Sequence, residues 1–248
     1  MSKKLKSASN LYLDGIRDGN IQQAVRDNTG RRYTQHSTGV KNGIEGFIEF
    51  FEPFLVRCPI RDIQIVRSIV DGQYVFLQAY QDINNGDAKW VTTDLFDTDN
   101  LDKIIEHWDV ISAFEPIAGS INDAVNGPTE IHDLEKTDTN KETVRNFLCD
   151  VMVLGHRERL ADYIDLDELV VHASKGVGVF DDYVGSYDHV FKIIGQGNFV
   201  VAFSRVKQEG QEIARFDIFS LQGGKIRELW VNQELVPPKV EWVNGGKF

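Results

Sequence analysis

The sequence predicts an α+β protein made of two similar halves. Helical periodicity comes first in each half, and strand-like alternation follows it. The strand-like runs are joined by short turns, which favours antiparallel neighbours. The same order of segments then occurs a second time along the 248 residues. An internal repeat of this kind indicates a duplicated domain.

Two helical segments open the first half. Apolar residues recur at helical spacing in Leu5–Asp27, which predicts an amphipathic helical region. The segment Ile44–Arg57 carries a broad stripe of phenylalanines, namely Phe47, Phe50, Phe51 and Phe54. We expect this stripe to belong mainly to the core, with one edge available to line a pocket.

Four runs rich in β-branched and aromatic residues follow and predict a meander of strands. Asn84-Asn85-Gly86-Asp87 is a strong hairpin signal between the second run and the third. The predicted strands are Ile60–Val70, Gln73–Asp82, Lys89–Thr98 and Lys103–Phe114.

The second half repeats this order with one shortened segment. A helix is predicted at about Glu142–Leu154, and alternating runs extend to Leu235. His172 and Gly197 are closer in sequence than their counterparts His36 and Gly72, so we expect the second helix of this half to be truncated.

The repeat extends to individual residues. Asp94-Leu95-Phe96 matches Asp217-Ile218-Phe219, and Lys103–Trp108 matches Lys225–Trp230. The pattern predicts domains at residues 1–118 and 139–248, joined by a polar linker at 119–138. The strand faces that carry Trp108 and Trp230 need to be buried against another surface, which predicts that the two halves pack as an intramolecular pseudo-dimer. Further homo-oligomerisation is possible but is not required by the sequence.

Composition and charge narrow the function classes. Lys plus Arg is 27 against 38 Asp plus Glu, a net charge of −11 that repels nucleic acid. No apolar run approaches the length of roughly 18 residues that a membrane span needs. Cys58 and Cys149 show no metal-binding spacing, so we expect a cytoplasmic protein without disulfides, metal or organic cofactor.

Three short motifs carry a resemblance to a known family. Tyr33-Thr34-Gln35-His36, Asp94-Leu95-Phe96 and Glu106-His107-Trp108-Asp109-Val110 resemble the SnoaL-like polyketide cyclase family of the nuclear transport factor 2-like superfamily. The resemblance implies a bent antiparallel sheet wrapped around helices, with a cone-shaped apolar pocket. It also implies cofactor-free chemistry such as aldol-type ring closure or isomerisation. The chain departs from the family at Gln78 and Tyr80, where close relatives often carry histidines.

The resemblance and the strand alternation together select a candidate site. Alternation puts His107 and Asp109 on one face of their strand and Glu106 and Trp108 on the other. The resemblance implies that Asp94 points into the pocket with His107 and Asp109. The candidate catalytic residues are Asp94, Asp109, His107 and His36, and the candidate ligand-binding residues are Tyr33, Gln78, Tyr80, Phe96, His172 and Asp217.

Structural roles compete with these functional ones. Asp94 could brace a tyrosine, and His36 could be a satisfied structural histidine. His36, His107 and Asp109 could also be interpreted as iron ligands, but nothing in the sequence fixes that geometry.

Two function classes therefore remain open. One is a cofactor-free acid/base catalyst (a cyclase, isomerase or aldol-type enzyme) acting on a small hydrophobic carbonyl compound. The other is a non-catalytic module that binds a small apolar ligand or serves association. Leu229 and Val231 replace His107 and Asp109 in the second half, so we expect any chemistry in the first half.

Overall fold

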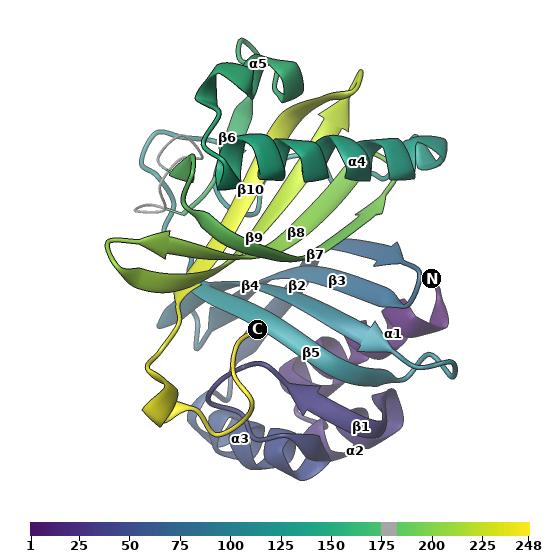
Figure 1. The fold of residues 1–248 in the computed structure, drawn as a ribbon. Coiled ribbons are helices and arrows are strands. Elements are labelled where there is room, and N and C mark those ends of the chain that lie inside the picture. The colour runs from purple at the N-terminus through teal and green to yellow at the C-terminus, as the bar shows by residue number, and fades with distance from the viewer. Residues whose placement is uncertain (175–182) are drawn as a thin grey trace. The chain divides into compact units, whose positions relative to one another are not determined.

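The computed structural model describes residues 1–174 and 183–248 and contains two compact units (Figure 1). Unit 1 consists of Met1–Ala113 together with Pro237–Phe248, and unit 2 of Phe114–Val236. The two-part α+β architecture agrees with the sequence prediction. The division of the chain differs from it, because the last segment belongs to unit 1 and the expected linker belongs to unit 2.

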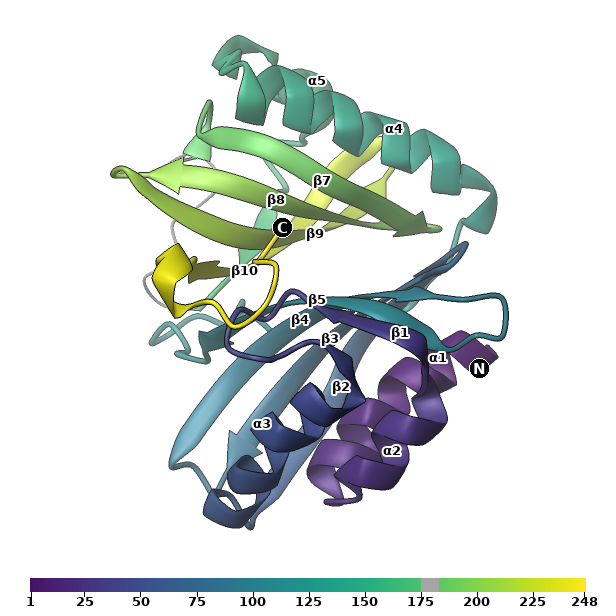
Figure 2. The same ribbon diagram turned by 60° about the horizontal axis from the view of Figure 1, so that its bottom comes forward.

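Unit 1 is a five-stranded sheet with helices on one face (Figure 2). Its strand order is β1-β5-β4-β3-β2, in which β1 runs parallel to β5 and the other neighbours are antiparallel. The sheet is therefore mixed, where the sequence predicted a wholly antiparallel one. The elements are α1 (Lys3–Asn10), the π-helical η1 (Leu11–Arg17), α2 (Ile21–Asn28), β1 (Thr29–Gln35), α3 (Gly43–Arg57), β2 (Arg61–Asp71), β3 (Tyr74–Ile83), β4 (Ala88–Thr98) and β5 (Ile104–Ala113).

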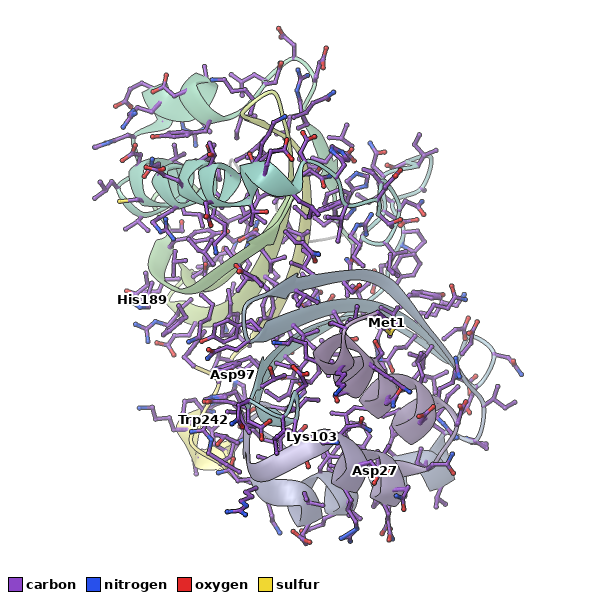
Figure 3. All side chains as sticks on the ribbon, turned by 90° about the vertical axis from the view of Figure 1, so that its right-hand side faces the viewer. Met1, Asp27, Asp97, Lys103, His189 and Trp242 are labelled. Atoms are coloured by element: carbon purple, nitrogen blue, oxygen red, sulfur yellow. The ribbon has the colours of Figure 1, made fainter. Side chains whose placement is uncertain are left out.

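The core of unit 1 lies between the sheet and these helices. Leu11 and Val25 from the helices pack in one buried cluster with Val75 and Leu77 of β3. Alternation in β3 sends these odd-numbered residues toward the helices. The Lys103 ammonium also donates a hydrogen bond to the Asp27 carbonyl, which connects the loop before β5 to α2 (Figure 3).

Unit 2 repeats the topology of unit 1. Its strand order is β6-β10-β9-β8-β7, with β6 parallel to β10. Its elements are η2 (Leu134–Lys136), α4 (Thr137–Phe147), the π-helical η3 (Leu148–Val153), η4 (Arg157–Arg159), α5 (Leu160–Tyr163), β6 (Val170–His172), β7 (Tyr187–Gln196), β8 (Phe199–Gln208), β9 (Gln211–Gln222) and β10 (Lys225–Leu235). The truncated helix is expected between His172 and Gly197, and residues 175–182 of that range lie outside the described residues.

The C-terminal segment, Pro237–Phe248, folds against the loop that follows β1. It contains the short η6 (Lys239–Glu241), and the indole of Trp242 donates to the Pro237 carbonyl at 2.8 Å (Figure 3). The Val243 amide donates to the Thr38 carbonyl, and the Asn244 side chain donates to the carbonyls of Ser37 and Val40. These bonds fix the segment within unit 1.

The helices of residues 1–174 and 183–248 are too short or too polar to cross a membrane.

Candidate functional site

Unit 1 encloses a cavity of about 340 Å³ between α3, η1 and the sheet. Its walls are mainly apolar and aromatic, and a few polar groups gather on the sheet side. The phenylalanine stripe of α3 forms one wall, so its role is larger than the core role that the sequence predicted. The lining residues are Leu11, Tyr12, Ile16, Gln35, Ser37, Val40, Phe47, Phe50, Phe51, Phe54, Arg57, Gln81, Trp90, Asp94, Phe96, His107, Asp109 and Ile111.

The register of β4 and β5 brings the two candidate aspartates together. Asp94 lies directly opposite Asp109 in the antiparallel pair, and Phe96 lies opposite His107. Residues two apart on a strand share a face, so all four side chains point to the same side of the sheet. Directly opposite carboxylates repel each other, and each therefore needs a compensating partner.

Asp94 is fully buried and accepts two hydrogen bonds. Its Oδ1 lies 2.8 Å from Nε2 of His107, and its Oδ2 accepts a 2.7 Å bond from the Tyr12 hydroxyl. Burial raises the pKa of Asp94 above its ordinary value, although the bond to His107 opposes that shift. Burial also raises the pKa of Tyr12 well above the usual range, so the phenol keeps its proton and donates.

His107 connects Asp94 to β1. Its Nδ1 lies 3.0 Å from Oε1 of Gln35, whose amide nitrogen donates to the Tyr33 hydroxyl. In this arrangement both ring nitrogens face oxygen acceptors, so Nδ1 carries a hydrogen and a further proton is shared between Nε2 and Asp94. The imidazole also stacks on Phe96, with ring centroids 4.5 Å apart, which holds its orientation. Asp94 and His107 thus form a buried acid/base pair.

Asp109 is compensated by a lysine from the far end of the sequence. Its Oδ1 lies 2.8 Å from Nζ of Lys247, a residue with only 2% of its surface exposed. Burial alone would raise the pKa of Asp109, but Lys247, His107 and the Ser37 hydroxyl together lower it below its ordinary value. The cavity therefore holds one carboxyl that retains its proton more readily and one that is ionised.

Sequence reasoning did not identify Lys247. The available signal was the Val-Asn-Gly motif, which occurs at Val125–Gly127 and again at Val243–Gly245. Such a repeat indicates that the segment before Lys247 has the same structural role in both halves. Tyr12 and Gln35 were also missed as partners of the site.

Several predicted residues lie outside the cavity lining. His36 stacks on Trp108 and lies 2.8 Å from Glu106, both of which share the opposite face of β5 from His107. Gln78 and Tyr80 alternate with Leu77 and Ala79, which pack in the core, so they occupy the other face of β3. Gln78 accepts a hydrogen bond from Arg67 there.

Tyr33 contributes to the site indirectly. It is buried, accepts the Gln35 bond and packs edge-on against Phe47, but it does not line the cavity itself.

Unit 2 retains the histidine–tryptophan arrangement of unit 1 but changes the partner of the equivalent aspartate. His172 stacks on Trp230 and lies 2.8 Å from Glu228, which reproduces the His36 arrangement of unit 1. Asp217, the counterpart of Asp94, is buried in an ion pair with Arg215 at 2.9 Å and accepts a bond from the Tyr187 hydroxyl. The imidazole of unit 1 is thus replaced by a guanidinium from the same strand.

No group of three or more His, Cys, Asp or Glu side chains in residues 1–174 and 183–248 is arranged to hold a metal ion.

Comparisons with known proteins give structural matches only. No protein-family model matches the sequence, and no curated protein does. One solved structure, of a protein assigned as a polyketide cyclase from Bacillus cereus ATCC 10987, is 18% identical over 44% of this chain and 74% of that chain, with a TM-score of 0.40. A protein assigned as a SnoaL-like polyketide cyclase from Jannaschia sp. CCS1 is 19% identical over 44% of this chain and 85% of that chain, with a TM-score of 0.38.

An epoxide hydrolase of the LEH-like type from M. tuberculosis is 14% identical over 44% of this chain and 83% of that chain, with a TM-score of 0.37. The similarity of this chain to these structures is one of fold.

Proposed function

We propose that unit 1 is a cofactor-free acid/base catalyst that acts on a small hydrophobic carbonyl compound, as a cyclase, isomerase or aldol-type enzyme. One observation carries the proposal. Two carboxyl groups lie opposite each other on the wall of an apolar cavity, and their surroundings move their pKa values in opposite directions. Such a difference separates an acid role from a base role.

Each carboxyl group then has a defined task. Ionised Asp109 removes a proton from the carbon next to the carbonyl group, and the electron pair of that C–H bond moves into an enolate. The proton shared by Asp94 and His107 leaves the hydrogen bond within that pair and bonds instead to the substrate oxygen on which negative charge develops. Return of the proton from Asp109 to another carbon completes an isomerisation, and replacement of that proton by a solvent deuteron before its return gives isotope exchange. In a ring closure the enolate carbon attacks a second carbonyl carbon, and the alkoxide oxygen that forms takes up the proton held by Asp109.

The walls of the cavity define the substrate class. Aromatic side chains of α3 and Phe96 suit a flat or cyclic apolar body, because such contacts favour offset stacking. The volume of about 340 Å³ suits a small molecule. Proton transfer by a positioned side chain contributes typically about 10²–10⁴-fold in rate, which sets the size of effect to look for.

Deuterium exchange tests this proposal directly. The ketone 2-tetralone is incubated with protein in D₂O, and incorporation of deuterium beside the carbonyl group is followed by mass spectrometry. We expect wild-type protein to exceed the buffer rate, and Asp109→Asn and Asp94→Asn to lose about 10²-fold or more of that excess. Asp97→Asn, three residues from Asp94 on β4 and therefore on the opposite face of the strand, is the matched control and should retain the wild-type rate.

Two results would count against catalysis. Wild-type exchange equal to buffer, at concentrations where 2-tetralone binding is measured by calorimetry, would favour the alternative of a small-ligand-binding module. Equal loss in Asp97→Asn would show that the effect is not specific to the cavity face.

For unit 2 we propose a role without catalysis. Its only retained carboxylate at the equivalent position, Asp217, is held by Arg215, and Leu229 and Val231 occupy the positions of His107 and Asp109. Unit 2 therefore lacks the second carboxyl group at these positions, and with it the division into an acid and a base on which the proposal for unit 1 depends.

A further inference from the structure

We propose that Lys247, on the C-terminal segment, is the positioning residue that keeps Asp109 ionised and oriented, so that the site of unit 1 is completed by residues 237–248. This inference rests on the proposed function for its catalytic consequence. The ion pair itself is supported by geometry: Nζ of Lys247 lies 2.8 Å from Oδ1 of Asp109, and both side chains are buried.

The C-terminal segment holds Lys247 by several independent contacts. The Asn244 side chain donates to two carbonyls of the loop after β1, at 2.6 and 2.8 Å. The carbonyl of Gly246, the residue immediately before Lys247, lies 2.9 Å from Nδ1 of His36. Gly246 has φ +109, and a Cβ there would lie 2.3 Å from the ring of Trp242. Glycine is therefore required for the segment to fold back on itself.

The duplication provides a comparison, because unit 2 contains a copy of the Val-Asn-Gly motif but, at the aligned positions, no equivalent of the Lys247–Asp109 ion pair. The first copy of the motif, Val125–Gly127, lies in unit 2, where the Asn126 carbonyl accepts a 2.7 Å bond from the Trp230 indole. The segment around each motif therefore contacts the His–Trp stack of the unit in which it lies, through Asn126 in unit 2 and through Gly246 in unit 1.

Beyond the motif, the two copies diverge in a correlated way. Alignment of Val125 with Val243 places Thr129 at the position of Lys247, and the repeat places Val231 at the position of Asp109. Both members of the ion pair are present in one unit and both are absent from the other. This pattern is expected if the lysine serves the aspartate rather than general stability of the segment.

Physical chemistry gives the consequence of the pair. A carboxyl group buried in an apolar cavity tends to keep its proton, whereas an adjacent ammonium favours the ionised form. The charged and titratable groups around Asp109 come from four other elements and from its own strand: Lys247 on the C-terminal segment, Asp94 on β4, Tyr12 on η1, Tyr33 on β1 and His107 on β5. Of these, Lys247 contributes the largest attraction.

The first test needs no substrate. The side-chain carboxyl carbons of aspartates are followed by ¹³C NMR between pH 3 and 8, and the Asp109 signal is assigned from its loss in Asp109→Asn. We expect the titration midpoint of Asp109 to rise by about 1–3 pH units in Lys247→Met and to remain near the wild-type value in Lys247→Arg. An unchanged midpoint in Lys247→Met would overturn the proposal. Lys247→Gln, which keeps a donor but no charge, gives the same comparison if Lys247→Met fails to fold.

The second test uses the 2-tetralone exchange rate as a function of pH. In Lys247→Met the acidic limb of the profile should move to higher pH by the same amount as the NMR midpoint, and Lys247→Arg should restore it. A uniform loss of rate with an unmoved limb would indicate a merely structural lysine and overturn the positioning role. Absence of exchange in the wild type would contradict the proposed function alone, because the NMR midpoints still decide the role of Lys247.

Discussion

Replacement of Asp217 by Asn should strongly destabilise unit 2, because the carboxylate is the counter-charge of a fully buried arginine. Arg215 is 0% exposed and donates to Asp217 at 2.9 Å and to Gln233 at 2.9 Å. Burial by itself lowers the pKa of Arg215, but Asp217 raises it more, so the guanidinium stays charged. Removing one partner of a buried ion pair costs about 3–5 kcal/mol, since it leaves an uncompensated buried charge.

The equivalent substitution in unit 1 gives the contrast. Asp94→Asn removes a carboxyl group whose pKa is raised, and its partners Tyr12 and His107 can both bond to an amide. We expect that substitution to cost only about 1–3 kcal/mol. The same change at two equivalent positions should therefore have different effects, with activity lost at Asp94 and stability lost at Asp217.

Native-state hydrogen exchange measures the two units separately. Peptides from β8 and β9 report on unit 2, and each 1.4 kcal/mol of lost stability increases exchange through global opening about tenfold. Asp217→Asn should accelerate exchange in these peptides by about 10²–10⁴-fold and leave peptides of β3 and β4 unchanged.

A double substitution supplies the decisive control. Arg215→Met with Asp217→Leu removes both charges and should restore slow exchange, because apolar replacements of a buried pair are often neutral or stabilising. If the double variant exchanges as fast as Asp217→Asn, the loss of stability does not come from an uncompensated charge on Arg215, and this explanation is refuted.

Two further predictions concern pH and the repeated motif. The folded state binds the Asp94 proton more tightly than the unfolded state does, because the pKa of Asp94 is raised. The free energy of unfolding should therefore fall as pH rises from about 3.9 through the raised pKa. Asp94→Asn should remove that fall in urea titrations between pH 4 and 8. The lowered pKa of Asp109 acts in the opposite sense, because its stabilisation is present above about pH 3.9 and is lost as pH falls through the lowered value. Gly127→Ala should destabilise unit 2 by more than about 1 kcal/mol, since Gly127 has φ +91 and a Cβ there would lie 2.8 Å from the Trp230 ring. Gly119→Ala, with positive φ but no atom within 4 Å, is its control, and an equal effect of both would exclude the contact with Trp230 as the cause.

The strands β2–β5 of unit 1 were predictable from local patterns, because strand alternation and hairpin chemistry act over a few residues. The four predicted strands correspond to β2–β5 with shifts of at most one residue at their ends. Alternation along β5 also separates His107 and Asp109 from Glu106 and Trp108, as the sequence indicated.

Long-range features were not predictable in the same way. The parallel pairing of β1 with β5 joins Gln35 to His107, and nothing in either segment's local sequence specifies that register. Lys247 was missed for the same reason, since its contact with Asp109 spans 138 residues. His36 was expected in the pocket because the resemblance linked it to the site, while the structure pairs it with Glu106. The intramolecular pseudo-dimer stays a prediction.

The division of unit 1 into two stretches of sequence has a consequence for the order in which the protein folds. The contact between His36 and Gly246 closes a loop of 210 residues that contains the whole of unit 2. Loop-closure entropy grows only with the logarithm of length, so the long insertion is tolerated thermodynamically. Timing is affected more strongly, because synthesis proceeds at about 5–20 residues per second and residues 114–247 take roughly 7–27 s. During that interval the nascent first unit has both aspartates but lacks the cation that compensates one of them, so unit 2 is able to complete its sheet before unit 1 completes its site.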